Sequence, residues 1–339
     1  MIMSNKFQHK ITIKEVAEKS GVAISTVSRV LNGRDRVSDS TRRKVESAIA
    51  QLNYSHNPVA AALITKRTNI ILVVVPDFIN NFFSTIVQGV EEQLKSLGYY
   101  SMVTSTGDAS NVDIEYIRQK FSSLVDGVIV IPSSESFINY KNWDKPYVIV
   151  DRYIMGSNMN AVVEDNYGGT YRLTEELISS GHKKIAIISG NSRLCVCSER
   201  IRGYKDALIS HGIVVNDDYV CLGDMYQQCG ESYFTSLMSS SNPPTAIVAG
   251  NNLICEGCII ASRNLGYEIG KDISLVGFDD SLLARINIPA ITVVDTPALE
   301  MGKRAAAMLL KQINNATSVA EEIILGVELV VRNSIKKIQ

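Results

Sequence analysis

Residues 12–33 read TIKEVAEKSGVAISTVSRVLNG, two short amphipathic patterns separated by a glycine. Thr12 followed by Glu15 is the pattern of a capping box, in which each side chain satisfies a free amide at the start of a helix. The apolar residues Ile13, Val16 and Ala17 recur at helical spacing, so one stripe of this helix is expected to be buried. Gly21 is expected to end the helix, because glycine adopts backbone conformations that other residues resist.

The second pattern has an apolar face and a polar face. Its inner face would be formed by Val27, Val30 and Leu31, and its outer face by Ile24, Ser25, Ser28, Arg29 and Asn32. A third helix, begun by Ser38, would pack through Val45, Ala48, Ile49 and Leu52. Three short helices with a tight turn between the first two form a helix-turn-helix, whose second helix fits the major groove of DNA.

Charge is distributed unevenly along the chain. Residues 1–67 contain twelve lysines and arginines against five acids, whereas the remaining residues contain 22 basic and 30 acidic side chains. A basic head on an acidic body indicates a polyanionic partner for the head alone. The alternative is a small helical cap with a solvated polar face, because helix-turn-helix spacings also occur in proteins that do not bind DNA.

The opening stretch, continued by VSDSTRRKV, LNY and NPVAAAL, resembles the amino-terminal domain of the LacI/GalR family of bacterial transcription repressors. The resemblance implies that Ile24, Ser25 and Arg29 read base edges. It also implies phosphate or nearby base contacts for Thr12, Thr26, Ser28, Asn32 and Arg36. Hydroxyl, amide and guanidinium groups suit both kinds of contact.

Residues 57–68, NPVAAALITKRT, favour a helix that is too short to persist alone. In the resembled family this hinge becomes helical on operator DNA, where two copies pair and a leucine enters the minor groove and kinks the duplex. The resemblance therefore implies DNA contacts for Asn57, Ala60 and Leu63. His56 stands where the family often has proline, and Ala61 where it often has arginine, so no minor-groove arginine contact is expected at 61. A plain tether is the alternative.

From residue 69 onward, short apolar runs alternate with helical patterns. The expected strands are 70–75, 100–103, 127–131, 147–150, 184–189, 246–250, 274–278 and 291–294. In one of the intervening helices the apolar residues are Phe83, Val87, Val90, Leu94 and Leu97. Two such series predict an α/β body of two lobes, each a doubly wound parallel sheet, behind an all-α helix-turn-helix head. Ligands of such folds bind at the carboxyl ends of the strands, in the cleft between lobes.

The body resembles the periplasmic-binding-protein-like effector domain of the same family, through stretches such as DNYGGTYRLTEELISSGHKKIAIISG, ERIRGYKDAL and SLVGFDDS. The resemblance implies a head over 1–56, a hinge over 57–68 and an effector-binding and dimerisation domain over 69–339. Chain crossings near 166, 295 and 327 would give one lobe 69–165 and 295–326, and the other 166–294 and 327–339. Since no leucine-heptad tail follows LVVRNSI, a homodimer is expected.

Candidate effector contacts follow from the same resemblance. Arg200 matches a ligand-gripping arginine and Asp279 an aspartate that accepts hydrogen bonds from the ligand, a pair that suits a sugar or sugar derivative. Further candidates are Phe82, Phe83, Asp151 and Asn251, the last two of which could instead cap loops. Arg152 and Arg193 would favour a sugar acid or a sugar phosphate if they face the cleft. Asn252 stands where the family usually has aspartate.

Other chemistry receives little support from the sequence. Its six cysteines lie between 195 and 258 and include C-x-C and C-x-x-C spacings. The stretch ICEGCII, however, has the pattern of a helix in which small residues pack. We therefore expect neither a metal nor a cofactor. Scattered histidines and the lack of a P-loop, H-E-x-x-H or G-x-S-x-G motif give no indication of an enzyme. The opening MIMSNKFQHK lacks the apolar core of a signal peptide, and no window reaches the roughly 18 apolar residues of a membrane span, so a cytoplasmic protein is expected.

The sequence therefore predicts a transcriptional repressor that binds a pseudo-palindromic operator as a homodimer and responds to a small carbohydrate-type effector. Three alternatives remain open. A catabolite-type regulator would answer to a phosphorylated protein partner, a sugar-binding protein would have the same body without a DNA role, and an enzyme would turn its ligand over.

Overall fold

The computed structural model describes residues 11–31, 37–54, 67–107, 111–133, 143–152, 159–191, 194–314 and 319–338, excluding the side chains of 111–114 and 116. The predicted DNA contacts Asn32, Arg36, Asn57, Ala60 and Leu63 lie outside these residues, as do His56, Ala61 and Arg193. The chain divides into two compact units, Met1–Thr68, which spans the predicted head and hinge, and Asn69–Gln339 (the body).

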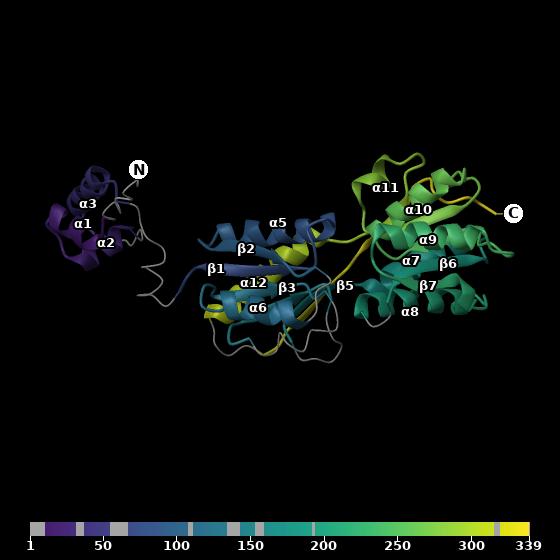
Figure 1. Ribbon diagram of the computed structural model, residues 1–339, viewed down its shortest axis with the longest axis horizontal. Helices are drawn as coiled ribbons and strands as arrows, with labels where there is room; N and C mark the ends of the chain where they lie inside the picture. Colours follow the sequence, from purple (N-terminus) through teal and green to yellow (C-terminus); the bar gives the residue numbers. More distant parts are fainter. Residues whose placement is uncertain are drawn as a thin grey trace, which may run out of the picture. The chain divides into compact units, whose positions relative to one another are not determined.

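The described part of the head contains α1 (Ile13–Ser20), α2 (Ile24–Leu31) and α3 (Asp39–Leu52) (Figure 1). At the start of α1 the Glu15 carboxylate accepts the Thr12 backbone N–H at 2.7 Å. Gly21 ends α1 with a φ of 68°, and Ser38 begins α3, where its hydroxyl accepts the Thr41 N–H at 3.4 Å. These boundaries confirm the predicted helix-turn-helix.

The core of the head is small and drawn from all three helices. Its buried residues are Val16, Ala17, Val27, Val30, Val45 and Ala48. A unit of this size buries a modest apolar area, so each of these side chains contributes a large share of its stability. The polar residues of α2 remain outside this core.

The body contains two sheets, each covered on both faces by helices (Figure 1). The first lobe's sheet has the spatial order β11 (Glu322–Leu325), β5 (Ala161–Glu164), β4 (Tyr147–Val150), β3 (Gly127–Val130), β1 (Ile70–Val75) and β2 (Tyr100–Ser105), with parallel neighbours throughout. Alternate residues of β1 face opposite sides, as the two-residue period of a strand requires. Ile71 and Val73 pack under α5 (Asn81–Lys95) and α12 (Ala298–Asn314), whereas Leu72 packs on the side of α6 (Asn111–Phe121).

The second lobe's sheet has the order β12 (Glu328–Val330), β10 (Thr292–Asp295), β9 (Ser274–Phe278), β8 (Ala246–Ala249), β6 (Ile185–Gly190) and β7 (Val220–Gly223). Here α9 (Gln227–Met238) and α10 (Asn252–Asn264) cover one face, and α7 (Asn166–Ser179) and α8 (Cys195–Ser210) cover the other. The short elements η2 (Asp217–Tyr219) and α11 (Leu282–Ile286) complete the lobe.

The chain passes between the sheets after β5, after β10 and between β11 and β12. Close packing of helices accompanies this path. A Cβ on Gly89 of α5 would stand 2.0 Å from the Leu299 carbonyl oxygen of α12, so only glycine allows the two helices to cross so closely.

The predicted two-lobed α/β fold of the body is confirmed, although some details differ from the prediction. The second sheet is not entirely parallel, since β12 runs antiparallel to β10. Leu97 does not extend the apolar face of α5, because the helix ends at Lys95 and the Leu97 side chain is 56% exposed. In the parts of the chain that the structure describes, no helix combines the length and apolar character needed to cross a membrane.

Candidate DNA interface and effector cleft

The predicted base-reading residues share the outward face of α2. Val27 and Val30 fix the rotation of this helix by packing inward. Ser25 and Arg29 are exposed, the Ile24 side chain is 44% exposed, and Thr26 and Ser28 are half-buried. The result is an apolar, hydroxylated and cationic surface of the kind that contacts thymine methyls, base edges and phosphates. Thr12 lies apart from this helix, where its hydroxyl donates to Glu15 at 2.8 Å.

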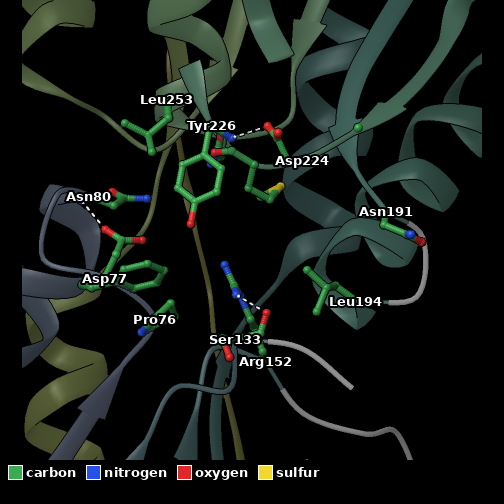
Figure 2. Close-up of a pocket in the computed structure, with 14 residues that line it drawn as sticks. Pro76, Asp77, Asn80, Ser133, Arg152, Asn191, Leu194, Asp224, Tyr226 and Leu253 are labelled. Carbon is green, nitrogen blue, oxygen red and sulfur yellow. Dashed lines mark hydrogen bonds between the residues drawn. The ribbon is translucent and has the colours of Figure 1, made fainter. Parts of the chain in front are cut away.

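A cavity of about 240 Å³ lies between the two lobes of the body. It is lined from the first lobe by Pro76, Asp77, Asn80, Phe83, Ser133 and Arg152, and from the second by Asn191, Leu194, Gly223, Asp224, Met225, Tyr226, Asn251 and Leu253 (Figure 2). Most of these residues follow the carboxyl ends of β1, β3, β4, β6, β7 and β8. This is the edge at which doubly wound sheets bind ligands.

The cavity combines apolar walls with a few fixed polar groups. Phe83 of the first lobe and Tyr226 and Leu253 of the second supply apolar surface. Asp77 accepts the backbone N–H groups of Ile79 and Asn80, each at 2.8 Å, so its carboxylate is held by its own loop. Such a lining suits a small molecule with both an apolar face and several hydroxyl groups.

A side-chain hydrogen bond between Asn252 and Asn80 joins the two lobes beside the cavity. The Asn252 amide at the start of α10 donates to Asn80 Oδ1 at 2.8 Å, and both residues are buried. Asn80 Oδ1 also accepts the Phe82 N–H at 3.0 Å, which caps α5. The contact requires these parts of the two lobes to lie close together.

A layer of buried charge lies behind the cavity. Arg200 on α8 donates to Asn166 Oδ1 at 2.7 Å, to Glu164 Oε1 at 3.1 Å and to the Gly250 carbonyl. Its guanidinium carbon lies 3.7 Å from the centre of the Phe278 ring. Three of the five N–H groups of this guanidinium therefore donate to the protein, and Arg200 links the end of β5 to the second lobe.

Two aspartates occupy corresponding places in the two lobes. Asp151 follows β4 and Asp279 follows β9, with φ of 68° and 69°, a left-handed conformation that non-glycine residues rarely adopt. Asp279 accepts the Thr296 hydroxyl at 2.7 Å, and Asp151 lies 3.4 Å from the Arg152 guanidinium. Burial raises the pKa of Asp279, although Arg200 and the Thr296 hydrogen bond oppose the shift. Strain of this kind concentrates at functional sites.

The remaining sequence candidates are divided between the cavity and its surroundings. Phe83 and Asn251 line the cavity. Asn251 also caps α10, where its side chain accepts the Ile254 N–H at 2.8 Å, so the capping role considered for it in the sequence is present as well. Phe82 packs into the first lobe's core instead. Arg152 lines the cavity, but its guanidinium donates to the Pro132 and Ser133 carbonyls and faces Asp151.

Glu164 is the one buried member of the charged layer that the sequence analysis missed. Its side chain is 0% exposed at the end of β5. Burial and the nearby Asp151 raise its pKa well above the ordinary value, with Arg200 opposing the shift. The signal available in the sequence was an acid closing the apolar run AVVE, directly before the DNYGG stretch.

All six cysteines are free, and burial keeps most of them unreactive. It raises the pKa of Cys221 and Cys229 to about 11 and that of Cys255 to about 12, so these thiols are protonated near neutral pH. Within the described ranges no group of histidine, cysteine and acidic side chains is arranged to hold a metal ion.

Comparison with known proteins identifies the family of both parts of the chain. Residues 12–57 match the bacterial regulatory proteins of the lacI family, and residues 68–333 match the periplasmic binding proteins and sugar binding domain of the LacI family. The chain belongs to the LacI family of bacterial regulatory proteins. As a LacI-family member it is a DNA-binding transcriptional regulator and not an enzyme.

Individual relatives cover nearly the whole chain. A probable HTH-type transcriptional regulator, EndR of Paenibacillus polymyxa, is 35% identical over 92% of this chain and 93% of its own. The complex of the regulator CelR with cellobiose is 30% identical, with a TM-score of 0.74 over 96% and 99% of the two chains. The lac repressor dimer bound to operator and the anti-inducer ONPF is 26% identical, with a TM-score of 0.86 over the same shares. LacI-family regulators bind operator DNA and small-molecule effectors and act as dimers.

Proposed function

We propose that this LacI-family regulator is a homodimeric repressor whose affinity for a pseudo-palindromic operator is set by a sugar or sugar derivative. The observation that carries the proposal is the cavity between the lobes, whose lining comes from strand ends of both sheets. A ligand that touches both walls is bound best when they are close, so its binding energy favours closure. The cellobiose-bound relative CelR supports a carbohydrate as the ligand class.

The head contributes the operator contacts. Ile24, Ser25 and Arg29 on α2 would enter the major groove, with Thr26 and Ser28 beside them. The further contacts proposed by resemblance are Thr12, Asn32, Arg36, Asn57, Ala60 and Leu63. Two-fold symmetry of a dimer then implies two related half-sites in one operator. We place such a regulator in the cytoplasm, where it reaches the chromosome.

The allosteric step would be a change in the angle between the lobes. Effector binding in the cavity stabilises one angle, and the first lobes of the dimer shift relative to each other. The hinges then lose or gain their pairing on DNA. Because coupling is reciprocal, operator must change the effector affinity by the same factor by which effector changes the operator affinity.

The test begins with a thermal-shift screen of the full chain against neutral sugars, sugar acids and sugar phosphates. A ligand at 100 times its Kd stabilises a protein by about 2.7 kcal/mol, which is readily detected. Binding to DNA fragments from the chain's own genomic neighbourhood is then titrated with and without each active compound. Absence of DNA binding at low salt, with and without these compounds, would overturn the proposal.

The contact between Asn80 and Asn252 offers a sharper test of closure. Asn252→Ala removes a hydrogen bond formed in the closed arrangement, worth about 1 kcal/mol, and should weaken the effector three- to tenfold without touching the ligand. Asn264→Ala, at the exposed end of the same helix, is the matched control. Equal affinities for the two variants would remove closure from the mechanism.

A further inference from the structure

Three carboxyl groups and two guanidinium groups meet behind the cavity. The carboxyls belong to Asp151, Glu164 and Asp279, and the guanidiniums to Arg152 and Arg200. If all five were ionised, one negative charge would remain without a counter-charge in a region that water scarcely reaches. Burying an uncompensated charge is costly, and such groups usually neutralise themselves by binding a proton.

Glu164 is the group best placed to take this proton. One carboxylate oxygen accepts from Arg200 at 3.1 Å, whereas the other, Oε2, is buried and accepts no hydrogen bond from the described residues. The Glu164 and Asp151 carboxyl groups are close enough to share a hydrogen bond once Glu164 carries a proton. Asp279, by contrast, accepts the Thr296 hydroxyl, and Asp151 faces Arg152 at 3.4 Å. The unsatisfied oxygen therefore lies on Glu164, where protonation would cost no existing hydrogen bond.

Other titratable groups surround this layer and bear on its charge. Within the second lobe, Asp295 on β10 adds negative potential at Asp279. Cys197 on α8 is close enough to respond to Arg200, Arg152 and Asp151, but burial raises the pKa of its thiol, so it contributes no charge near neutral pH. Neither group supplies the missing positive charge.

The position of Glu164 connects this proton to the movement of the lobes. Glu164 ends β5 of the first sheet, immediately before the chain passes into α7 of the second lobe. Its neighbour Asp151 belongs to the first lobe, whereas Arg200 and Asp279 belong to the second. Separation of the lobes would admit water to this layer and lower the cost of a charged Glu164.

We propose that Glu164, next to Asp151, holds one proton when the lobes are closed and releases it to solvent when they open, so that closure is coupled to proton uptake. The link to the effector rests on the proposed function, whereas the proton and its link to the lobes do not. The direction of the pKa of Glu164, raised by burial and by Asp151, agrees with this assignment. Low pH therefore favours the closed form. The equilibrium shifts toward the open form as the pH rises from the ordinary glutamate pKa to the raised pKa of Glu164 in the closed form.

Two measurements on the full chain, without effector or DNA, test the proposal. Infrared spectra between about pH 5 and about pH 9 should show the carbonyl band of a protonated carboxyl that titrates above the ordinary glutamate range and is missing from Glu164→Gln. Glu322→Gln, on the neighbouring strand β11 and exposed, should retain the band. A spectrum without the band, or one in which Glu164→Gln retains it, would overturn the proton assignment.

The second measurement follows closure through Met225, which lines the cavity. Its ¹³C-labelled methyl signal, assigned with Met225→Leu, should shift with the infrared titration in the wild type and stay constant in Glu164→Gln. A methyl signal that ignores the titration would overturn the coupling. If Glu164→Gln fails to fold, Asp151→Asn replaces it, since loss of the neighbouring negative charge should lower the midpoint by about one pH unit. An unchanged midpoint would contradict the proposal, and none of these outcomes depends on operator binding.

Discussion

In the head, five candidate DNA-binding residues lie within positions 24–29 of one helix, whereas the body assembles its cleft from strand ends of two sheets and from residues as far apart as Asn80 and Asn252. The first surface depends on the rotation of one helix, fixed by a small core. The second depends on the angle between two lobes. Local contacts are therefore sufficient to build the proposed operator-reading surface, whereas the proposed effector cleft depends on how two separate lobes are placed relative to each other.

The largest expected effect follows from the small core of the head. Val45→Asp places an unpaired charge at a fully buried position of α3, at a cost of several kcal/mol, more than a unit of this size can tolerate. Binding to DNA should be lost while the body melts at its usual temperature by calorimetry. Ser47→Asp adds the same charge at an exposed position of α3 and should keep the head folded. If Val45→Asp also lowered the melting temperature of the body, the two units would not be independent.

The next effect separates two roles for Arg200. If it is a buried link between β5 and the second lobe, Arg200→Leu leaves Glu164 and Asp279 without their cation and should lower the free energy of unfolding of the body by about 3–5 kcal/mol. Arg202→Leu, on the same helix with its side chain 54% exposed, should change it by less than about 1 kcal/mol. Urea unfolding followed by circular dichroism measures both. A ligand-gripping role alone would instead lower effector affinity with unfolding unchanged.

A smaller effect tests the assignment of base and phosphate contacts in the head. Ser25 lies on the exposed face of α2, so its replacement should alter the preferred base at one operator position by about 1–3 kcal/mol. Lys14 is exposed on α1, and its replacement should weaken binding to all sequences alike and reduce the salt dependence. Binding to a library of operator variants at two salt concentrations distinguishes the two. Indistinguishable profiles would show that α2 is not the reading helix.

The same contrast explains what the sequence could reveal about the fold. The head was predicted in detail because its signals are local: Gly21 ends α1, Ser38 begins α3, and Val27 and Val30 set the inward face of α2. Long apolar strands such as β1 were equally clear. Four strands were missed, namely β5, β7, β11 and β12. Three of them, β7, β11 and β12, expose some of their residues, so alternation with polar side chains obscures the strand pattern. β5 is buried throughout, but its apolar run has only three residues before Glu164.

The cleft was only partly accessible from the sequence for a related reason. Resemblance drew attention to Arg200 and Asp279, and the structure brings both into one buried layer. It did not indicate that Arg200 would donate hydrogen bonds to Asn166, Gly250 and Glu164, because these partners come from separate elements. Hydrogen bonds across the sheets are set by tertiary packing, which no local pattern encodes.

The smallest predicted effect concerns a buried histidine in the body. His182 is 0% exposed and forms hydrogen bonds with Thr245 at 2.8 Å, with the Lys336 carbonyl at 2.9 Å and with Ser274 at 2.8 Å. Burial lowers its pKa from the ordinary value of 6.5, although the Lys336 carbonyl opposes the shift. The folded body therefore keeps His182 neutral at a pH where the unfolded chain binds a proton.

The sign of the pH dependence follows from this difference in bound protons. The stabilisation is complete above about pH 6.5 and decreases as the pH falls toward the lowered pKa, by at most about 1.4 kcal/mol per pH unit. Urea unfolding of the body between about pH 5.5 and about pH 7.5 should show this loss in the wild type and a flatter profile in His182→Gln. His211→Gln, at an exposed position after α8, should keep the wild-type slope. If His182→Gln kept the wild-type decrease in the free energy of unfolding at low pH, that decrease would belong to other groups. The neutral amide at this position cannot take up a proton in mild acid.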